Sequence, residues 1–133
     1  MIIFELFNKI ADWKWIANDP AYVRATFKVN DLQYAIHCIK EITYIKNSIW
    51  DIAFGLNTFH GPKYNITHTG NEYIVFATIV DIIKEFIVDH NPDVITFSAE
   101  EPNRLALYRR MVNTLLPDWK TEIGDNRFFV SKP

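Results

Sequence analysis

The sequence has only one cysteine, Cys38, among its 133 residues. A single cysteine cannot close a disulfide within the chain, which excludes the disulfide-stabilised class of small secreted domains. We therefore expect a reducing compartment, the cytoplasm. Because Cys38 lies inside a strand pattern, a place in the core is favoured over a reactive thiol.

An excess of either charge is also missing. The chain has 14 Lys and Arg residues against 16 Asp and Glu residues, which gives a formal net charge of -2 at pH 7. This balance excludes a strongly basic nucleic-acid binder and an acidic disordered tail. Nucleic acid is therefore not an expected partner.

No apolar run approaches the roughly 20 residues that cross a bilayer. The longest run is interrupted by Thr78 and Asp81. Segment 1–15 has neither a basic n-region nor a small-residue cleavage site. We expect no signal peptide and no membrane partner.

Several motifs of metal and nucleophile chemistry are absent. The sequence contains no His-Glu-x-x-His, no cysteine pair and no Gly-x-Ser-x-Gly. His60 and His68 bracket a predicted strand, where two imidazoles could bind a metal or act as acid and base. Their spacing is unspecific, so surface or structural histidines are favoured and we expect no metal site.

Apolar and aromatic residues are plentiful. Hydrophobic residues make up 49% of the chain and aromatic residues 15%. A chain of this length and composition can bury one core, so we expect a single domain over residues 1–133.

The first half of the chain reads mainly as strands. Residues 22–29 and 32–39 alternate around Asn30-Asp31, a pair that tolerates positive φ, and this pattern predicts a β-hairpin. Residues 48–57 and 63–67 predict two more strands, the second after a Gly61-Pro62 turn. Residues 2–11 have apolar side chains at helical spacing and predict a short helix.

The second half mixes helices and strands. Residues 71–90 place a wide apolar face opposite a narrow polar stripe, which predicts a helix on a sheet that ends before Pro92. Residues 93–99 are typical of a central strand. A helix from about 98 to 115 and a hairpin over 119–124 and 127–132 complete the chain. The predicted class is α+β, with a mixed, mostly antiparallel sheet flanked by helices.

The joint before the helix of residues 71–90 contains one glycine, Gly70. Backbone N–H groups at a helix start can bind an anion when glycines let a phosphate approach. Here a single glycine is followed by Asn71 and Glu72, and the Glu72 carboxylate would oppose a pyrophosphate. A helix cap, with Thr69 or Asn71 as N-cap and Glu72 complementing the dipole, is favoured over an anion site.

Two further groups have both a functional and a structural interpretation. The aromatic residues Trp13, Trp15 and Trp50 could stack on a ligand, but the core of a small domain is favoured. Arg104, Arg109 and Arg110 could meet a phosphate or an acidic partner, but a solvated helix face is favoured.

From residue 63 onward the chain resembles the GNAT acyltransferase superfamily. The resemblance rests on "KYNITHTGNEYIVFATIVDIIKEFI", on "PDVITFSAEEPNRLALYRRM" and on the final hairpin. In that superfamily a strand enters a glycine-bearing loop and a helix, and a strand and a second helix follow. Within it, "ITFSA" and "RLALYRRM" look like a group of small bacteriophage proteins with a GNAT-like outline.

The resemblance implies an acetyl-CoA site at the joint. The coenzyme pyrophosphate would lie on the loop and helix start at Thr69, Gly70, Asn71 and Glu72. The superfamily pattern is Arg or Gln, two residues, Gly, one residue, then Gly or Ala. Neither placement of Gly70 in this pattern reproduces it.

The resemblance also implies roles on the second helix. Tyr108 matches a tyrosine that protonates the departing thiolate, and Asn103 matches loosely the polar residue before it. Glu41, Asp51 or a water would serve as the base.

Three functions follow from these observations. The first is a GNAT-like phage accessory protein with a degenerate acyl-CoA site, acting in the host cytoplasm as a binding module on a host or viral protein. It needs no cofactor. The second is an active N-acyltransferase that uses acetyl-CoA and relies mainly on positioning. The third is a phosphoesterase using His60 and His68, which requires both imidazoles to converge on one cleft.

Overall fold

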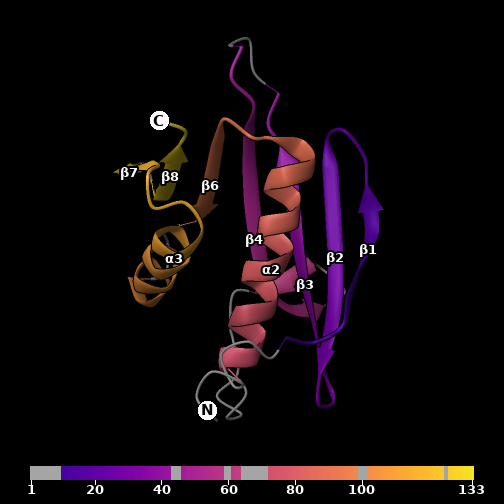
Figure 1. Cartoon of the computed structure of the whole chain (residues 1–133). Coiled ribbons are helices and arrows are strands. Elements are labelled where there is room, and N and C mark those ends of the chain that lie inside the picture. Colours follow the sequence, from indigo (N-terminus) through magenta and orange to yellow (C-terminus); the bar gives the residue numbers. More distant parts are fainter. Residues whose placement is uncertain (1–9, 43–45, 59–60, 64–71, 99–101, 125) are drawn as a thin grey trace.

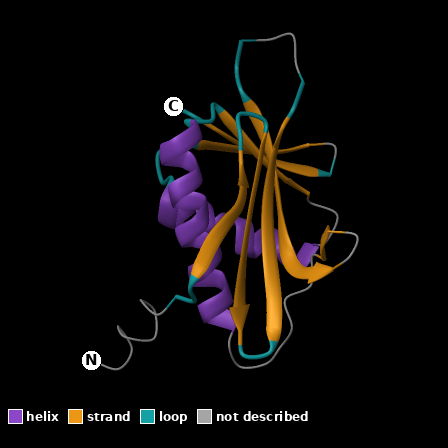
Figure 2. Ribbon diagram, turned by 90° about the vertical axis from the view of Figure 1, so that its right-hand side faces the viewer, coloured by secondary structure: helices purple, strands orange, loops and turns teal. Residues whose placement is uncertain are grey.

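The computed structural model of the chain describes residues 10–42, 46–58, 61–63, 72–98, 102–124 and 126–133. A mixed sheet forms one layer, and helices cover one of its faces (Figures 1 and 2). The strand order is β1-β2-β3-β4-β6-β8-β7, with β5 paired to β4 off this path. The elements are β1 (Trp13–Asn18), β2 (Tyr22–Val29), β3 (Leu32–Lys40), β4 (Ile49–Thr58), β5 (Gly61–Lys63), α2 (Glu72–His90), β6 (Val94–Ser98), α3 (Pro102–Leu115), β7 (Lys120–Gly124) and β8 (Arg127–Ser131).

The hairpin predicted around Asn30-Asp31 is confirmed. Val29 of β2 pairs with Leu32 of β3, so only two residues form the turn, and Asn30 has a φ of 54°. Asparagine tolerates this left-handed conformation, which two-residue hairpin turns require.

The predicted α+β class and the mixed, mostly antiparallel sheet are also confirmed. Among the described strands, β4 and β6 form the one parallel pair. Parallel neighbours need a crossover, and α2 supplies it by running back along the sheet (Figure 1). Asn91, with a φ of 47°, ends α2 just before Pro92.

The predicted Gly61-Pro62 turn was wrong. Gly61 and Pro62 do not form a turn but lie within β5, where they pair with Thr58 and Asn57 of β4. Proline is tolerated there because β5 is a short strand off the main path of the sheet. Residues 64–67 of the predicted strand lie outside the described residues.

The N-terminal region also differs from the prediction. Residues 2–9 of the predicted helix lie outside the described residues, and Ile10 and Ala11 are not helical. Instead, β1 begins at Trp13 and pairs with β2, with a break in register between Trp15 and Ala17. The sequence did not predict this edge strand.

The polar stripe of α2 holds β1 in place. Thr78, which belongs to the predicted polar stripe, is fully buried. Three hydrogen bonds join α2 to residues 11–18, the segment that contains β1. Ala11 N donates to Thr78 Oγ1 and Trp13 Nε1 donates to Asp81 Oδ2, each at 2.9 Å. His90 Nε2 lies 2.7 Å from Asn18 Oδ1. Because these partners are spread along α2, they fix the direction of β1 as well as its position.

The core lies between the helices and the facing side of the sheet. Trp50 of β4 packs edge-on against Phe86 of α2, with the ring centroids 5.0 Å apart, and both side chains are buried. Trp13 and Trp15 are half-buried against the same core. Cys38 is buried as predicted, and burial raises the pKa of its thiol. The core interpretation of the three tryptophans and of Cys38 is confirmed.

The other face of the sheet carries none of the described helices and is called the helix-free face (Figure 2). Arg24 of β2 and His37 of β3 are paired in register on this face, and Arg24 Nη2 donates a hydrogen bond to Asn57 Oδ1 at 2.7 Å. His37 is half-buried. Burial and, next, the charge of Arg24 lower the pKa of His37, while the charge of Asp51 partly opposes them.

This environment of His37 makes stability depend on pH. Because its pKa is lower in the folded state, the unfolded chain binds more protons at mildly acidic pH. We expect the free energy of unfolding, measured with urea, to fall from pH 7.5 to pH 5.5. We expect His37→Gln to reduce this fall. The control Gln33→Ala, an exposed neighbour on β3 that does not titrate, should keep it. Equal pH slopes for His37→Gln and the parent protein would contradict this.

Candidate functional site

The parallel strands β4 and β6 separate within the sheet. Their pairing ends at Ile52 and Phe97, whereas β4 continues to Thr58 with β3 and β5 as its neighbours. The start of α2 lies toward the same end of the sheet (Figure 1). Ligands of open sheets bind beyond the carboxyl ends of parallel strands, so this separation is the candidate functional site.

An aromatic cluster occupies the helix side of the separation. We call Phe54, Phe97, Tyr108 and Phe128 the Tyr108 cluster. The Tyr108 ring is stacked on Phe97 at 4.6 Å between centroids, lies edge-on to Phe54 at 6.0 Å and is 6.3 Å from Phe128. Tyr108 is 2% exposed. The ring is therefore part of the core at the point where β4 and β6 part.

The acetyl-CoA site predicted at residues 69–72 lies mostly outside the described residues, since Thr69, Gly70 and Asn71 are not among them. Glu72 is the first residue of α2 and is half-buried. An acidic residue in the first turn complements the helix dipole, as the cap interpretation expects. Asn103 lies in the first turn of α3, and its side chain is not described.

The described residues fit an acyl-CoA pyrophosphate poorly. The first basic residue of α2 is Lys84, more than three turns after Glu72. A pyrophosphate at this helix start would face the Glu72 carboxylate, and no basic side chain of the first three turns would balance it. The aromatic ring of Tyr108 is closed off from solvent at the same end of the sheet.

The two carboxylates considered as a base lie elsewhere. Asp51 neighbours Trp50 and Ile52 of β4, whose buried side chains face the helices, so Asp51 lies on the opposite face. Asp51 and Glu41 are ion-paired there with Arg127, which lies 3.5 Å from Asp51 Oδ1. The sheet separates both carboxylates from the ring of Tyr108, so they do not fit the role of its partner base.

Thr96 completes this ion-paired group. Its hydroxyl donates to Asp51 Oδ1 at 2.8 Å and accepts from Arg127 Nη2 at 2.6 Å. Burial alone would lower the pKa of Arg127, but its hydrogen bond with Glu41 and the charges of Glu41 and Asp51 raise it. All four side chains bond to one another. The group therefore connects the end of β3 with β4, β6 and β8 and does not form a ligand-binding site.

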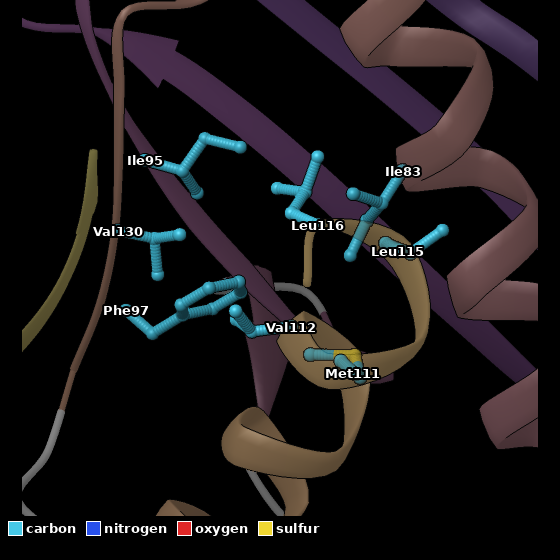
Figure 3. A pocket seen from close by; sticks show the side chains of 8 residues that line it. All are labelled: Ile83, Ile95, Phe97, Met111, Val112, Leu115, Leu116 and Val130. Atoms are coloured by element: carbon cyan, nitrogen blue, oxygen red, sulfur yellow. The ribbon is translucent and has the colours of Figure 1, made fainter. Parts of the chain in front are cut away.

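A small gap in the core lies beside the Tyr108 cluster (Figure 3). Its volume is about 10 Å³, which is at the lower limit for one water molecule. The lining side chains, all apolar, come from α2, β6, α3, the segment after α3 and β8: Ile83, Ile95, Phe97, Met111, Val112, Leu115, Leu116 and Val130. The gap is a packing imperfection rather than a ligand site.

The other candidate histidines, metal ligands and arginines form no binding site among the residues that the structure describes. His60 and His68 lie outside it. No three His, Cys, Asp or Glu side chains within it are grouped to hold a metal ion. Arg109 and Arg110 are exposed on α3, with the Arg110 guanidinium 5.9 Å from the Phe76 ring. No described helix is long and apolar enough to span a membrane.

Sequence reasoning missed the polar groups on the helix-free face. His37 occupies a polar position of an alternating strand, two residues from Ala35 and Ile39. The period-2 pattern places these residues on one face. It does not reveal that Arg24 and Asp51 lie close to His37, because that depends on the order of β2, β3 and β4 in the sheet.

Comparisons with known proteins agree with this architecture. The model of a family described as "Family of unknown function (DUF6934)" matches residues 16–124. No curated protein matches the sequence significantly.

Similar solved structures include the spermidine N-acetyltransferase SpeG from Vibrio cholerae. A point mutant of SpeG has a TM-score of 0.52 and 16% identity, over 86% of this chain and 68% of that chain. A chimera of SpeG and hSSAT gives 0.52 and 16%, over 86% and 69%. A second chimera gives 0.51 and 15%, over 86% and 68%.

At this identity the likeness shows the fold and not the activity. SpeG is a GNAT-type acetyltransferase, so the scaffold of this chain is GNAT-like, as the sequence resemblance implied. With the family model covering most of the chain, the protein belongs to the Family of unknown function (DUF6934).

Proposed function

We propose that this chain is a GNAT-like binding protein with a degenerate acyl-CoA site, acting on a protein partner. The observation that carries the proposal is the burial of Tyr108. Its ring is 2% exposed and packs on Phe54, Phe97 and Phe128. A tyrosine that protonates the departing thiolate must reach the ligand through its hydroxyl, and a side chain that is 2% exposed is poorly placed for that contact.

The helix start supports the same proposal. Glu72 brings negative charge to the position where a pyrophosphate would lie, and Lys84 is the first basic residue of α2. An acidic residue in the first turn complements the helix dipole itself and so competes with an anionic ligand for that position. The superfamily's loop pattern is also absent around Gly70.

The resemblance of the sequence to small bacteriophage proteins suggests the setting. We propose that the chain is phage-encoded, that it acts in the host cytoplasm, and that its partner is a host or viral protein. This part rests on the motifs "ITHTGN…VFATIVDIIKEFI", "ITFSA" and "RLALYRRM".

Titration calorimetry with acetyl-CoA, and separately with coenzyme A, tests the degenerate site. We expect no heat of binding at millimolar ligand, because neither the charge at Glu72 nor the packing at Tyr108 accommodates the coenzyme. A far-UV circular dichroism spectrum of the same sample verifies that the protein is folded. Micromolar binding that is weakened by Gly70→Trp would contradict the proposal.

The alternative is an active N-acyltransferase that uses acetyl-CoA as its substrate. The position of Tyr108 favours it, because this residue contacts Phe54 and Phe97 where β4 and β6 part. The resemblance places the general acid of the superfamily on the same helix.

This alternative predicts that Tyr108→Phe lowers turnover of acetyl-CoA with amine acceptors by about 10²- to 10⁴-fold while the fold is kept. The matched control is Tyr22→Phe, which removes a hydroxyl from the helix-free face and should leave turnover unchanged. Release of free thiol reports the reaction. A parent protein that turns over no acetyl-CoA with any amine leaves the alternative without support.

A further inference from the structure

The outer edge of β7 is open for pairing with another strand. β7 ends the strand order, and no described strand lies beyond it (Figure 1). Its first four residues are exposed, and Ile123 is 51% exposed. An open edge with an exposed apolar residue is a template for a further strand.

The opposite edge of the sheet is different. β1 has an irregular register between Trp15 and Ala17, so its ladder of backbone groups is interrupted. It also presents the exposed Lys14. Bulges and edge lysines both hinder pairing with other chains; each edge has an exposed lysine, Lys14 on β1 and Lys120 on β7, but only β1 has a break in register. An additional strand is therefore favoured at β7 and not at β1.

Backbone geometry shows which residues of β7 can pair outward. Lys132 N donates to Asp93 O, so the backbone of Lys132 faces the β6 side. Ser131 must then face β7, where it pairs with Lys120. Because bonding directions alternate along a strand, Lys120 and Glu122 face β8, while Thr121 and Ile123 present their backbone groups at the open edge.

Symmetric antiparallel pairing of β7 with itself satisfies this alternation when it is centred on Lys120, Thr121, Glu122 or Ile123. Centring on Lys120 places like charges together, and centring on Ile123 leaves Lys120 and Glu122 without an opposite charge across the axis. Two registers remain. In one, Glu122 lies directly opposite Glu122 of the second copy, which places like charges together. In the other, Thr121 lies opposite Thr121, and Lys120 lies opposite Glu122 of the second copy. Lys120 and Glu122 of the second copy would form a non-hydrogen-bonded pair, in which the Cα atoms are only about 4.5 Å apart. Charge therefore selects the second register.

The same register matches the side chains on the helix face. Ile123 lies opposite Trp119 of the second copy, so its exposed side chain meets an aromatic ring that is already half-buried on the core. Threonine pairs and aromatic pairs with β-branched residues are favourable cross-strand neighbours. The charged pair, the threonine pair and the apolar pair therefore all favour the register in which Thr121 lies opposite Thr121 of the second copy.

We propose that β7 pairs with β7 of a second copy of this chain, forming a two-fold symmetric dimer with one continuous sheet. Thr121 lies on the two-fold axis, and two Lys120–Glu122 ion pairs connect the copies. Such an interface is isologous, because the same residues serve both partners. The proposal does not depend on whether the acyl-CoA site is degenerate.

Charge reversal tests both the interface and its register. We expect the parent protein to sediment as a dimer in analytical ultracentrifugation. Lys120→Glu places four acidic side chains together, and Glu122→Lys places four basic ones together. Each variant alone should dimerise with a dissociation constant raised roughly tenfold or more. An equimolar mixture of the two should form a heterodimer, because every cross-strand pair is again of opposite charge.

The controls separate this effect from a loss of folding. The Lys120–Glu122 contact within one chain is 3.6 Å long and highly exposed, so breaking it should cost little stability. Lys14→Glu makes the same charge change at the β1 edge and should leave the dimer intact. A monomeric parent protein, unweakened single variants, or a mixture that fails to associate would each overturn the proposal.

Discussion

The parallel pairing of β4 with β6 is the constraint on which the rest of the structure depends. It requires a crossover, and α2 provides it by returning along one face of the sheet. The pairing stops at Ile52 and Phe97. Beyond that point the sheet would have an open seam between two buried strands. The structure must fill this seam with a ligand or with side chains.

In this chain side chains fill it. The Tyr108 cluster places four aromatic rings from β4, β6, α3 and β8 at the seam, and each of these side chains is at most 3% exposed. Packing of this kind contributes to stability because buried rings remove large apolar areas from water. This packing at the end of the β4–β6 pairing is the physical basis on which the degenerate site is proposed.

The position of α2 has a second consequence, at the edge of the sheet. Three of its polar side chains, Thr78, Asp81 and His90, bond to the segment that includes β1. One edge of the sheet is thus fixed by the helix and interrupted by an irregular register. The other edge, at β7, is regular and uncovered by any described strand. This asymmetry makes β7 the natural place for association.

Local patterns in the sequence predicted most of the elements but not their environment. Alternating apolar and polar residues on either side of Asn30-Asp31 were enough to predict the β2–β3 hairpin, and helical periodicity was enough to predict α2. Both elements depend on residues that are close in the sequence. β1 was missed because a six-residue segment with two tryptophans is equally consistent with core aromatics, and its strand geometry depends on pairing with β2. Tyr108 was found through the family resemblance. The helical spacing of Tyr108 with Leu105, Met111 and Val112 predicts that it points inward, but its contacts with three phenylalanine rings depend on where β4 and β6 part.

The measurement that tests this account most directly is the stability of Tyr108→Ala. If the Tyr108 ring closes the seam between β4 and β6, its removal should lower the free energy of unfolding in urea by about 3–5 kcal/mol, the range for truncating a buried aromatic side chain. Tyr73→Ala, on the exposed side of α2, provides the comparison and should cost far less. A loss below about 1 kcal/mol for Tyr108→Ala would contradict the account, since a core ring cannot be removed so cheaply.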